Sequence, residues 1–288
     1  MGAWQMLQPR RFGGEALPAD EFVSAVAALA ARDGSSGWRC AMANAAAHRA
    51  GALPDHAGAV IWGADPGARV AVGLGPGGRL VDGRRLSGHW SEVTGADVAD
   101  WLLLAADGDR LVLVARADVA VSPRTAPTGL PDAGIADVQV VELPVDAERV
   151  FAARDDGAAV VGGAAAAAAV AGAADGLWQA HVAQVRQRLA ASYGSAEVGD
   201  LTVSTRQVAL AASDIDAATL QIRASLSQHP RSAARAQRQA AARARAAADR
   251  VLSSSRGHAL DASDPVASLW RDVHTGCRLT CELLDALD

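Results

Sequence analysis

The sequence contains no lysine, so all 27 of its basic residues are arginines. We attribute this to codon usage in a GC-rich genome and not to chemistry. With 32 acidic residues the net charge is -5, which gives no overall attraction toward nucleic acid or an anionic membrane. We therefore expect neither as a partner.

Cysteine is also scarce, and the three cysteines, Cys40, Cys277 and Cys281, are an odd number. Such a set makes no disulfide framework, so a reducing cytosol is the default. Residues 1–15 lack the apolar stretch of a signal peptide. The run at 160–174 is too short and too rich in Ala and Gly to span a bilayer, and we expect a cytoplasmic protein.

Several catalytic motifs are absent: the nucleophile elbow, the P-loop, H-E-x-x-H and zinc-type cysteine clusters. Gly73, Gly75 and Gly78 match G-x-G-x-x-G, but a dinucleotide site needs a helix directly afterwards. The residues that follow are typical of a hairpin, which favours a Gly-rich turn. His274, Cys277 and Cys281 share a helix, and we favour core packing for the cysteines over a metal site.

The fold is predicted in three parts, mainly α with a central antiparallel β-domain. Residues 1–66 form helices, the first with Asp20 as a candidate N-cap and the second with Ser35 or Ser36. Residues 67–150 hold short apolar runs separated by turn signals such as Asp82-Gly83 and Asp107-Gly108, a pattern typical of hairpins.

Residues 151–288 return to a helical period and predict a four-helix bundle over about 158–193, 202–228, 230–256 and 263–287. Breaks fall at Tyr193-Gly194, Pro230 and Gly257, and Asp264 before Pro265 is a good helix start.

One helix of the predicted bundle has two contrasting faces. Its Ala residues, at coiled-coil spacing, suit close packing against a neighbour. The opposite face carries Arg231, Arg235, Arg238 and Arg245. This stripe is either a solvated face, which we favour, or a contact for an anion or for the acidic residues of a second subunit.

Longer motifs carry a family resemblance. They are "GSSGW" (34–38), Trp62-Gly63, "SGHWSEVTG" (87–95) with Asp100-Trp101, "GLPDAGIADVQVVELPV" (129–145) and "SDPVASLWRDVHTG" (263–276). Together they resemble the acyl-CoA dehydrogenase superfamily, closest to its flavin-dependent, two-component monooxygenases. That fold has N-terminal helices, a β-barrel-like middle domain and a C-terminal four-helix bundle; here the N-terminal part looks short.

The resemblance implies a site between the β-domain and the bundle. Trp90, Ser91, Thr94 and Gly95 would bind FMN or FAD, with Trp90 flanking the ring and Thr94 near its reactive edge. An aromatic ring and a hydroxyl suit a planar heterocycle. His48 and His274 are the candidate catalytic residues, and His274 would face the site. The implied partners are a flavin reductase or homologous subunit and a small organic substrate, in a homo-dimer or tetramer.

Three departures from the family pattern concern the site. Leu279 stands where the monooxygenases carry a histidine that acts on the substrate, and the "GLRGTGS" loop has become "GLPDAGI". The carboxylate base of the dehydrogenases is also missing, since Thr280 occupies that region and Glu282 follows two residues later. General acid–base catalysis needs a positioned group, and none is evident beyond the two histidines.

Three functions follow from these observations. The first is a two-component monooxygenase that uses reduced flavin and oxygen. The second is an acyl-CoA dehydrogenase-like subunit that needs a homologous partner. The third is a non-redox protein on the same fold, since fold does not determine function.

Overall fold

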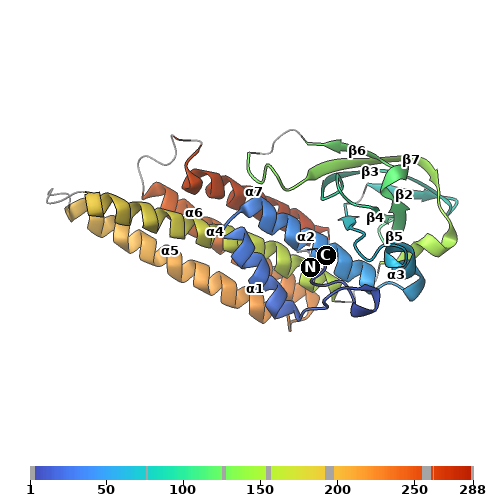
Figure 1. Ribbon diagram of the computed structural model, residues 1–288, viewed down its shortest axis with the longest axis horizontal. Coiled ribbons are helices and arrows are strands. Elements are labelled where there is room, and N and C mark those ends of the chain that lie inside the picture. Colours follow the sequence, from blue (N-terminus) through green and yellow to red (C-terminus); the bar gives the residue numbers. More distant parts are fainter. Residues whose placement is uncertain are drawn as a thin grey trace.

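The computed structural model describes residues 4–286 with gaps at 76, 125–127, 154–156, 192–197, 255–260 and 262. Long helices extend from one end of the molecule, and the strands gather at the other (Figure 1). Short helices near the N-terminus lie beside both parts. This arrangement confirms the predicted class, mainly α with a central β region.

The N-terminal region contains three helices, α1 (Ala19–Ala30), α2 (Gly34–Gly51) and α3 (Asp55–Trp62), after a short 3-10 turn at Arg10–Phe12. The predicted N-caps are wrong. Pro18 precedes α1 without a side-chain cap, and Asp33 caps α2 by accepting from the Ser36 amide at 2.5 Å. A carboxylate there satisfies a free amide and opposes the positive end of the helix dipole.

The β region forms two four-stranded sheets, with strand orders β1-β4-β5-β8 and β2-β3-β7-β6. The strands are β1 (Val70–Gly73), β2 (Gly78–Val81), β3 (Arg85–Thr94), β4 (Trp101–Ala106), β5 (Arg110–Ala115), β6 (Ala120–Pro123), β7 (Ile135–Pro144) and β8 (Val150–Ala152). The strand pairs are antiparallel as predicted, except that β1 pairs with β4 in parallel. The short strands β6 and β8 were not predicted.

The strand alternation of β3 supplies the core of the β region. Leu86, Trp90 and Val93 are buried, and they pack with Leu102 and Val138 of the neighbouring strands. The Gly-rich segment after β1 leads into β2 and not into a helix. This agrees with the prediction of a Gly-rich turn between strands.

The C-terminal helices are α4 (Ala158–Ala191), α5 (Val198–Ser225), α6 (Pro230–Ser253) and α7 (Pro265–Asp285), close to the predicted bundle. Asp264 caps α7 by accepting from the Val266 amide at 2.8 Å, and Pro265 occupies the first turn. The predicted breaks at Tyr193-Gly194 and Gly257 lie outside the described residues.

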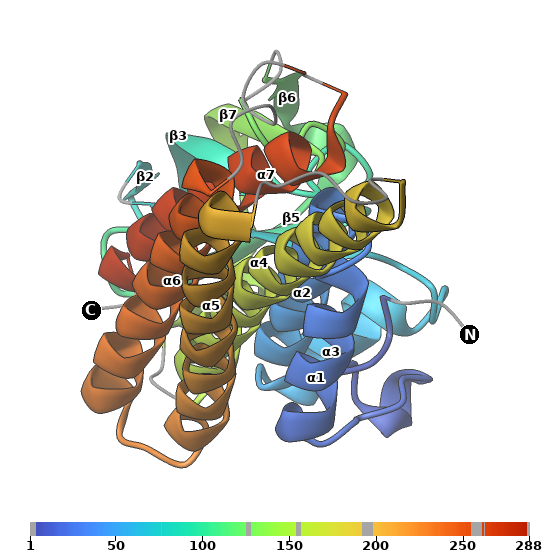
Figure 2. The same ribbon diagram turned by 90° about the vertical axis from the view of Figure 1, so that its left-hand side faces the viewer.

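Helix α4 is the centre of the helical part, in contact with α1, α2, α5, α6 and α7 (Figure 2). Its run of buried alanines and its glycines allow the neighbouring helices to approach its backbone very closely. A Cβ on Gly172 would lie 2.2 Å from the Ala27 carbonyl oxygen, and one on Gly176 would lie 2.0 Å from that of Ala31. The N-terminal helices and the bundle therefore share one hydrophobic core.

A segment of α4, Ala158–Gln187, is long and apolar enough to cross a membrane by length and composition. However, 83% of its most apolar window is buried inside the protein. That burial is typical of the core helix of a folded bundle.

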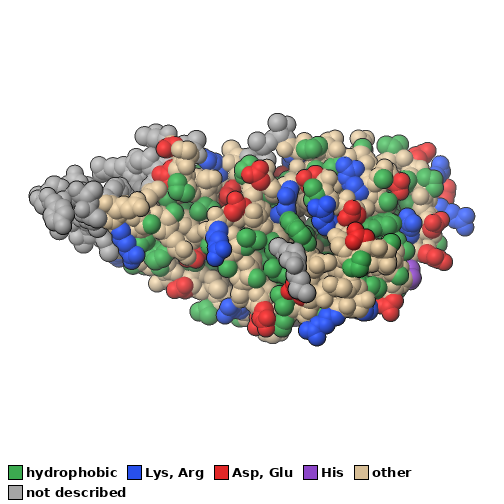
Figure 3. Space-filling model, in the orientation of Figure 1, with side chains coloured by type: hydrophobic (Ala, Val, Ile, Leu, Met, Phe, Trp, Pro, Cys, Tyr) green, Lys and Arg blue, Asp and Glu red, His purple; other side chains and the backbone are tan. Residues whose placement is uncertain are grey.

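The two faces of α6 separate as predicted. Ala233, Ala240, Ala244 and Ala247 are buried, whereas Arg231, Arg235 and Arg245 are exposed, and Arg238 donates to Asp285 at 2.6 Å. Arginines and acidic residues are interspersed over the face shown in Figure 3, in keeping with the small net charge.

Candidate functional site

A cavity of about 680 Å³ lies where the β region meets the helices. Its walls come from α2, the β1–β2 connection, β3, the start of α4 and the end of α7. Small-molecule sites typically measure about 300–1,000 Å³. The residues that line this cavity include Trp38, Arg49, His89, Ser91, Glu92, Thr94, Leu279 and Glu282.

Trp38 and Thr94 join α2 to β3 at the cavity wall. The Trp38 indole Nε1 donates to Thr94 Oγ1 at 3.0 Å, and Trp38 is only 2% exposed. Because the bond satisfies a buried donor, it holds the aromatic ring in a defined place. Thr94 and Ser91 thus line the cavity, and their predicted contact with a flavin stays a prediction.

Trp90 and Gly95 have other roles. Trp90 points into the core between the sheets, where its Nε1 donates to the Ala105 carbonyl at 2.9 Å and its side chain is buried. Gly95 has φ 78° and donates its amide to the Gly134 carbonyl at 2.8 Å, which makes it a turn residue. Neither lines the cavity, and the aromatic ring on its wall is that of Trp38.

The two candidate catalytic histidines also lie away from the cavity walls. His274 packs its ring on Trp270, 4.1 Å between centroids, and its Nε2 is 2.7 Å from Asp249 Oδ1. It therefore faces α6. His48 is half-buried on α2, between cavity-lining Ala46 and Arg49 in sequence but not itself a lining residue.

The imidazole that does lie at the cavity belongs to His89. Its Nδ1 is 3.5 Å from Ser91 Oγ, because the two side chains are two residues apart on one face of β3. Across the cavity, Arg49 of α2 is 8% exposed and also borders a second cavity of about 310 Å³.

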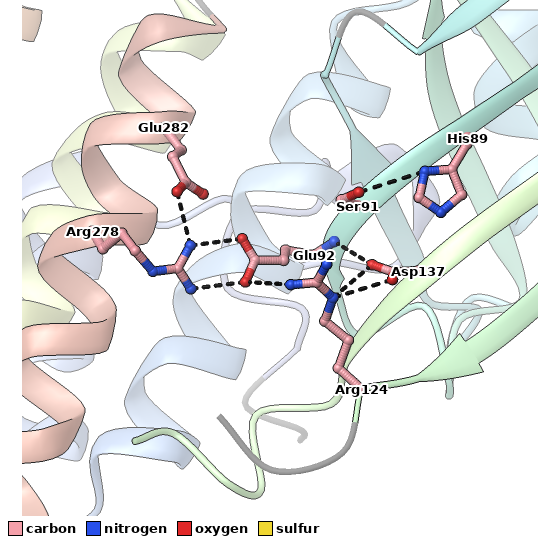
Figure 4. A network of polar contacts seen from close by, with 7 residues as sticks. All are labelled: His89, Ser91, Glu92, Arg124, Asp137, Arg278 and Glu282. Carbon is pink, nitrogen blue, oxygen red and sulfur yellow. Dashed lines mark hydrogen bonds and ion pairs between the residues drawn. The ribbon is translucent and has the colours of Figure 1, made fainter. Parts of the chain in front are cut away.

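A network of charges crosses from α7 to the β region beside the cavity (Figure 4). Arg278 donates from both terminal nitrogens to Glu92, each at 2.7 Å, and also to Glu282 at 2.8 Å. Arg124 contacts Glu92 at 3.0 Å and Asp137 at 2.9 Å. The network therefore fixes α7 against β3 and β7.

The charges of this network sustain one another. Hydrogen bonds and the nearby charge of Arg278 lower the pKa of Glu92 below its ordinary value, against the opposing effect of its burial. The same contacts with Glu92 raise the pKa of Arg278. Glu92 consequently stays ionised across the physiological pH range.

The α7 positions singled out in the sequence divide between the cavity and the core. Leu279 and Glu282 line the cavity, whereas Thr280 is buried and donates to the Gly276 carbonyl at 2.7 Å. Asp272 is also structural: its Oδ1 accepts from the Leu130 amide at 2.6 Å, and burial raises its pKa. The cavity thus has two carboxylates on α7, Glu282 and Asp285, which are paired with Arg278 and Arg238 respectively.

The cysteines behave as core residues. Cys40 and Cys277 are buried and Cys281 is partly exposed, and burial raises the pKa of both Cys40 and Cys277 to about 11. Within the described ranges, no group of three His, Cys, Asp or Glu residues could hold a metal ion.

Sequence reasoning missed His89, Glu92 and Arg49 as wall residues. His89 and Glu92 lie inside the "SGHWSEVTG" motif. Strand alternation places His89 on the face opposite to Trp90, and this pattern could have predicted that His89 points away from the core. Arg49 lies on α2, whose apolar pattern is too weak to show which face of the helix is buried. The partner of Glu92, Arg278, is 186 positions away, and no local pattern indicates that contact.

Comparison with known proteins shows which proteins the chain resembles. The family described as "Acyl-CoA dehydrogenase, C-terminal domain" matches residues 164–281. The chain is 26% identical over 319 residues to "Flavin-dependent monooxygenase, oxygenase subunit HsaA" of Mycobacterium tuberculosis (strain CDC 1551 / Oshkosh), covering 96% of this chain and 81% of that protein. The protein of the same name from Rhodococcus jostii (strain RHA1) is 26% identical, with 96% and 83% covered.

A solved structure, the 3-HSA hydroxylase from Rhodococcus sp. RHA1, superposes with a TM-score of 0.88 at 25% identity. It covers 99% of this chain, and this chain covers 85% of it. The likeness therefore includes the N-terminal helices, the β region and the bundle together. Residues 164–281 therefore match the acyl-CoA dehydrogenase C-terminal family, and the chain as a whole is similar in sequence and fold to flavin-dependent monooxygenases.

Proposed function

We propose that the protein is the oxygenase of a two-component system, which uses reduced flavin and molecular oxygen to oxygenate a small organic substrate. The observation that carries the proposal is the cavity between β3, α2 and α7, in a chain whose full-length relatives are named as flavin-dependent monooxygenases.

The cavity residues fit a planar heterocycle. Trp38 provides an aromatic surface, and Thr94, Ser91 and His89 place hydrogen-bonding groups along one strand. Beside them, a Cβ on Gly75 would meet no heavy atom within 4 Å, so the turn leaves open space. The volume of about 680 Å³ also leaves room for a ring system and a small substrate.

A bound reduced flavin would supply the electrons with which oxygen is activated. The residues of this chain would then bind, orient and shield the reactants. The Trp38–Thr94 pair holds the aromatic wall, and the apolar side chains Val72, Leu279 and Leu283 exclude water. His89, beside Ser91, is the wall imidazole, and its ring nitrogens can donate or accept a hydrogen bond.

The proposal extends to partners that the relatives suggest. "Oxygenase subunit" in their names implies a separate source of reduced flavin, so we propose a flavin reductase as the partner. A cytoplasmic location and a homo-oligomer built on the bundle belong to the same proposal. The exposed Arg231 and Arg235 of α6 are available on the outside of that bundle.

The test is anaerobic titration of the purified protein with oxidised and reduced FMN and FAD, followed by absorbance and flavin fluorescence. We expect tighter binding of the reduced form, and oxygen uptake when air is admitted. A Thr94→Val variant should bind reduced flavin more weakly, because valine has nearly the shape of threonine but lacks the hydroxyl that lines the cavity. Failure of every flavin form to bind would refute the proposal and favour the non-redox alternative.

A further inference from the structure

The backbone of β3 is irregular at Glu92, and the irregularity determines where this side chain points. Regular alternation would place Glu92 on the face of Trp90, inside the core. Instead the pairing with β7 shifts register between Trp90 and Val93, and Glu92 has φ 58°. Such a bulge redirects a side chain, and here it brings Glu92 to the cavity wall.

The redirected carboxylate is held rigidly. Arg278 binds it with two parallel hydrogen bonds of 2.7 Å, one to each oxygen, and Arg124 adds a contact of 3.0 Å to Oε1 (Figure 4). The Glu92 amide donates to Asp137 Oδ1 at 3.0 Å, and the Glu92 side chain is only 15% exposed. Bidentate pairing with a guanidinium fixes both position and orientation.

The carboxylate can accept more hydrogen bonds than these contacts supply. An ionised carboxylate offers about four acceptor positions. Oε1 receives hydrogen bonds or ion-pair contacts from Arg278 and Arg124, whereas the hydrogen bond to Oε2 comes from Arg278, and the Glu282 side chain also interacts with Glu92. Because the group is ionised it can accept but not donate, so a ligand group that meets Oε2 has to be a donor.

The surrounding charges favour the same kind of ligand. Glu282 and Asp285 add carboxylates to the α7 wall, each already paired with an arginine, Arg278 and Arg238 respectively. Arg49 and His89 lie on other walls of the cavity. An anionic ligand group that met Oε2 would lie against the charge of Glu92, whose side chain is only 15% exposed.

We propose that Glu92 is a specificity-determining residue of the cavity, whose Oε2 accepts a hydrogen bond from a hydroxyl or amino group of the substrate and whose charge excludes a carboxylate at that position. Arg278 is the positioning residue that holds Glu92 in place. The inference rests on the proposed function for the identity of the site, and it adds the chemical class of the substrate.

The experiment compares two probes of similar shape, 4-methylphenol and 4-methylbenzoate, by tryptophan fluorescence and saturation-transfer NMR. The wild-type protein should bind the phenol more tightly than the benzoate. In Glu92→Gln the dissociation constant of the benzoate divided by that of the phenol should fall by about tenfold or more. The phenol loses its hydrogen bond to a charged acceptor, and the benzoate no longer meets a like charge. The benzoate should gain affinity.

Glu142→Gln is the matched control. Glu142 also has a left-handed backbone, φ 46°, and also contacts an arginine, Arg85 at 3.6 Å, but it is exposed and remote from the cavity. Its probe ratio should equal that of the wild type. An unchanged ratio in a folded Glu92→Gln protein, a wild-type preference for the benzoate, or no binding of either probe would overturn the inference.

Two further measurements keep the result decisive. If Glu92→Gln does not fold, Arg278→Lys replaces it. Loss of the bidentate hydrogen bonds to Glu92 should lower the ratio of dissociation constants about threefold or more. An unchanged ratio would overturn the inference. Flavin titration of the same proteins separates the two proposals. A shifted ratio without flavin binding supports the role of Glu92 and refutes the proposed function, whereas flavin binding with an unchanged ratio does the reverse.

Discussion

At the scale of single residues, the Trp38–Thr94 hydrogen bond provides a direct test of the cavity wall. Thr94→Val keeps the shape of the side chain and removes the acceptor of the buried indole N–H. An unsatisfied buried donor costs about 1–3 kcal/mol. We expect the free energy of unfolding, measured by urea denaturation, to fall by about that amount.

The control for this change is Thr219→Val on α5. Thr219 donates to the Ile215 carbonyl within its own helix at 3.0 Å, where that carbonyl is already part of the helical hydrogen bonding. Removing the hydroxyl should cost about 0.5 kcal/mol or less. Equal losses in the two variants would mean that the Trp38 bond has no special importance.

The same scale shows what single-residue reasoning achieved. Ser91 and Thr94 were predicted from the motif resemblance to bind the flavin, and the structure places both on the cavity wall. Trp90 was assigned to the cofactor although strand alternation points its ring into the core. His274 stacks on Trp270 and faces α6, and only the packing of α7 against its neighbours decides which helix face meets the cavity.

At the scale of elements, the contact between α1 and α4 depends on glycine. Gly172→Ala would place a Cβ 2.2 Å from the Ala27 carbonyl oxygen, so the helices have to separate. Overpacking of this kind costs about 1–3 kcal/mol. Gly162→Ala on the same helix meets only the Ala45 Cβ at 3.8 Å and should be neutral or stabilising, by up to about 1 kcal/mol. Thermal unfolding of both variants measures the difference.

The network between β3 and α7 gives an element-scale prediction in pH. The folded pKa of Glu92 is lowered, so its contribution to stability is present above its ordinary value, 4.5, and is lost as the pH falls through the folded value. Glu92→Gln resembles the protonated form. The difference in melting temperature between wild type and Glu92→Gln should therefore be constant from neutral pH to about pH 5 and shrink in more acidic solution. A difference that grows in acid would contradict this assignment.

Elements were predicted unevenly, for physical reasons. The bundle helices follow from long runs of strong helix formers and from Asp264-Pro265 at the start of α7. The strands β6 and β8 are short edge strands of four and three residues, which carry too little alternation to detect. The parallel pairing of β1 with β4 depends on a long-range contact, Val70 with Trp101, to which no local pattern corresponds.

At the scale of the whole molecule, the cavity is a product of assembly. Trp38, Glu92 and Leu279 come from three regions far apart in the sequence, and they meet only when the β region docks on the helices. A family resemblance could predict that such a site exists. It could not predict the ionic network, since Glu92 and Arg278 become neighbours only through the bulge in β3 and the rotation of α7.

Whole-molecule stability can be followed through the thiols. Cys40 and Cys277 are buried, with pKa values raised to about 11, whereas Cys281 is partly exposed. Since the thiolate is the reactive form, a disulfide reagent at pH 8 should modify one thiol quickly and two only as fast as the protein opens. Cys281→Ser should abolish the fast phase, and urea should make all three thiols react together. Rapid modification of a second thiol in native protein would show that the bundle opens locally around Cys277 or Cys40 without global unfolding. Comparison of the modification rates of Cys277 on α7 and Cys40 on α2 then shows which of the two helices opens first.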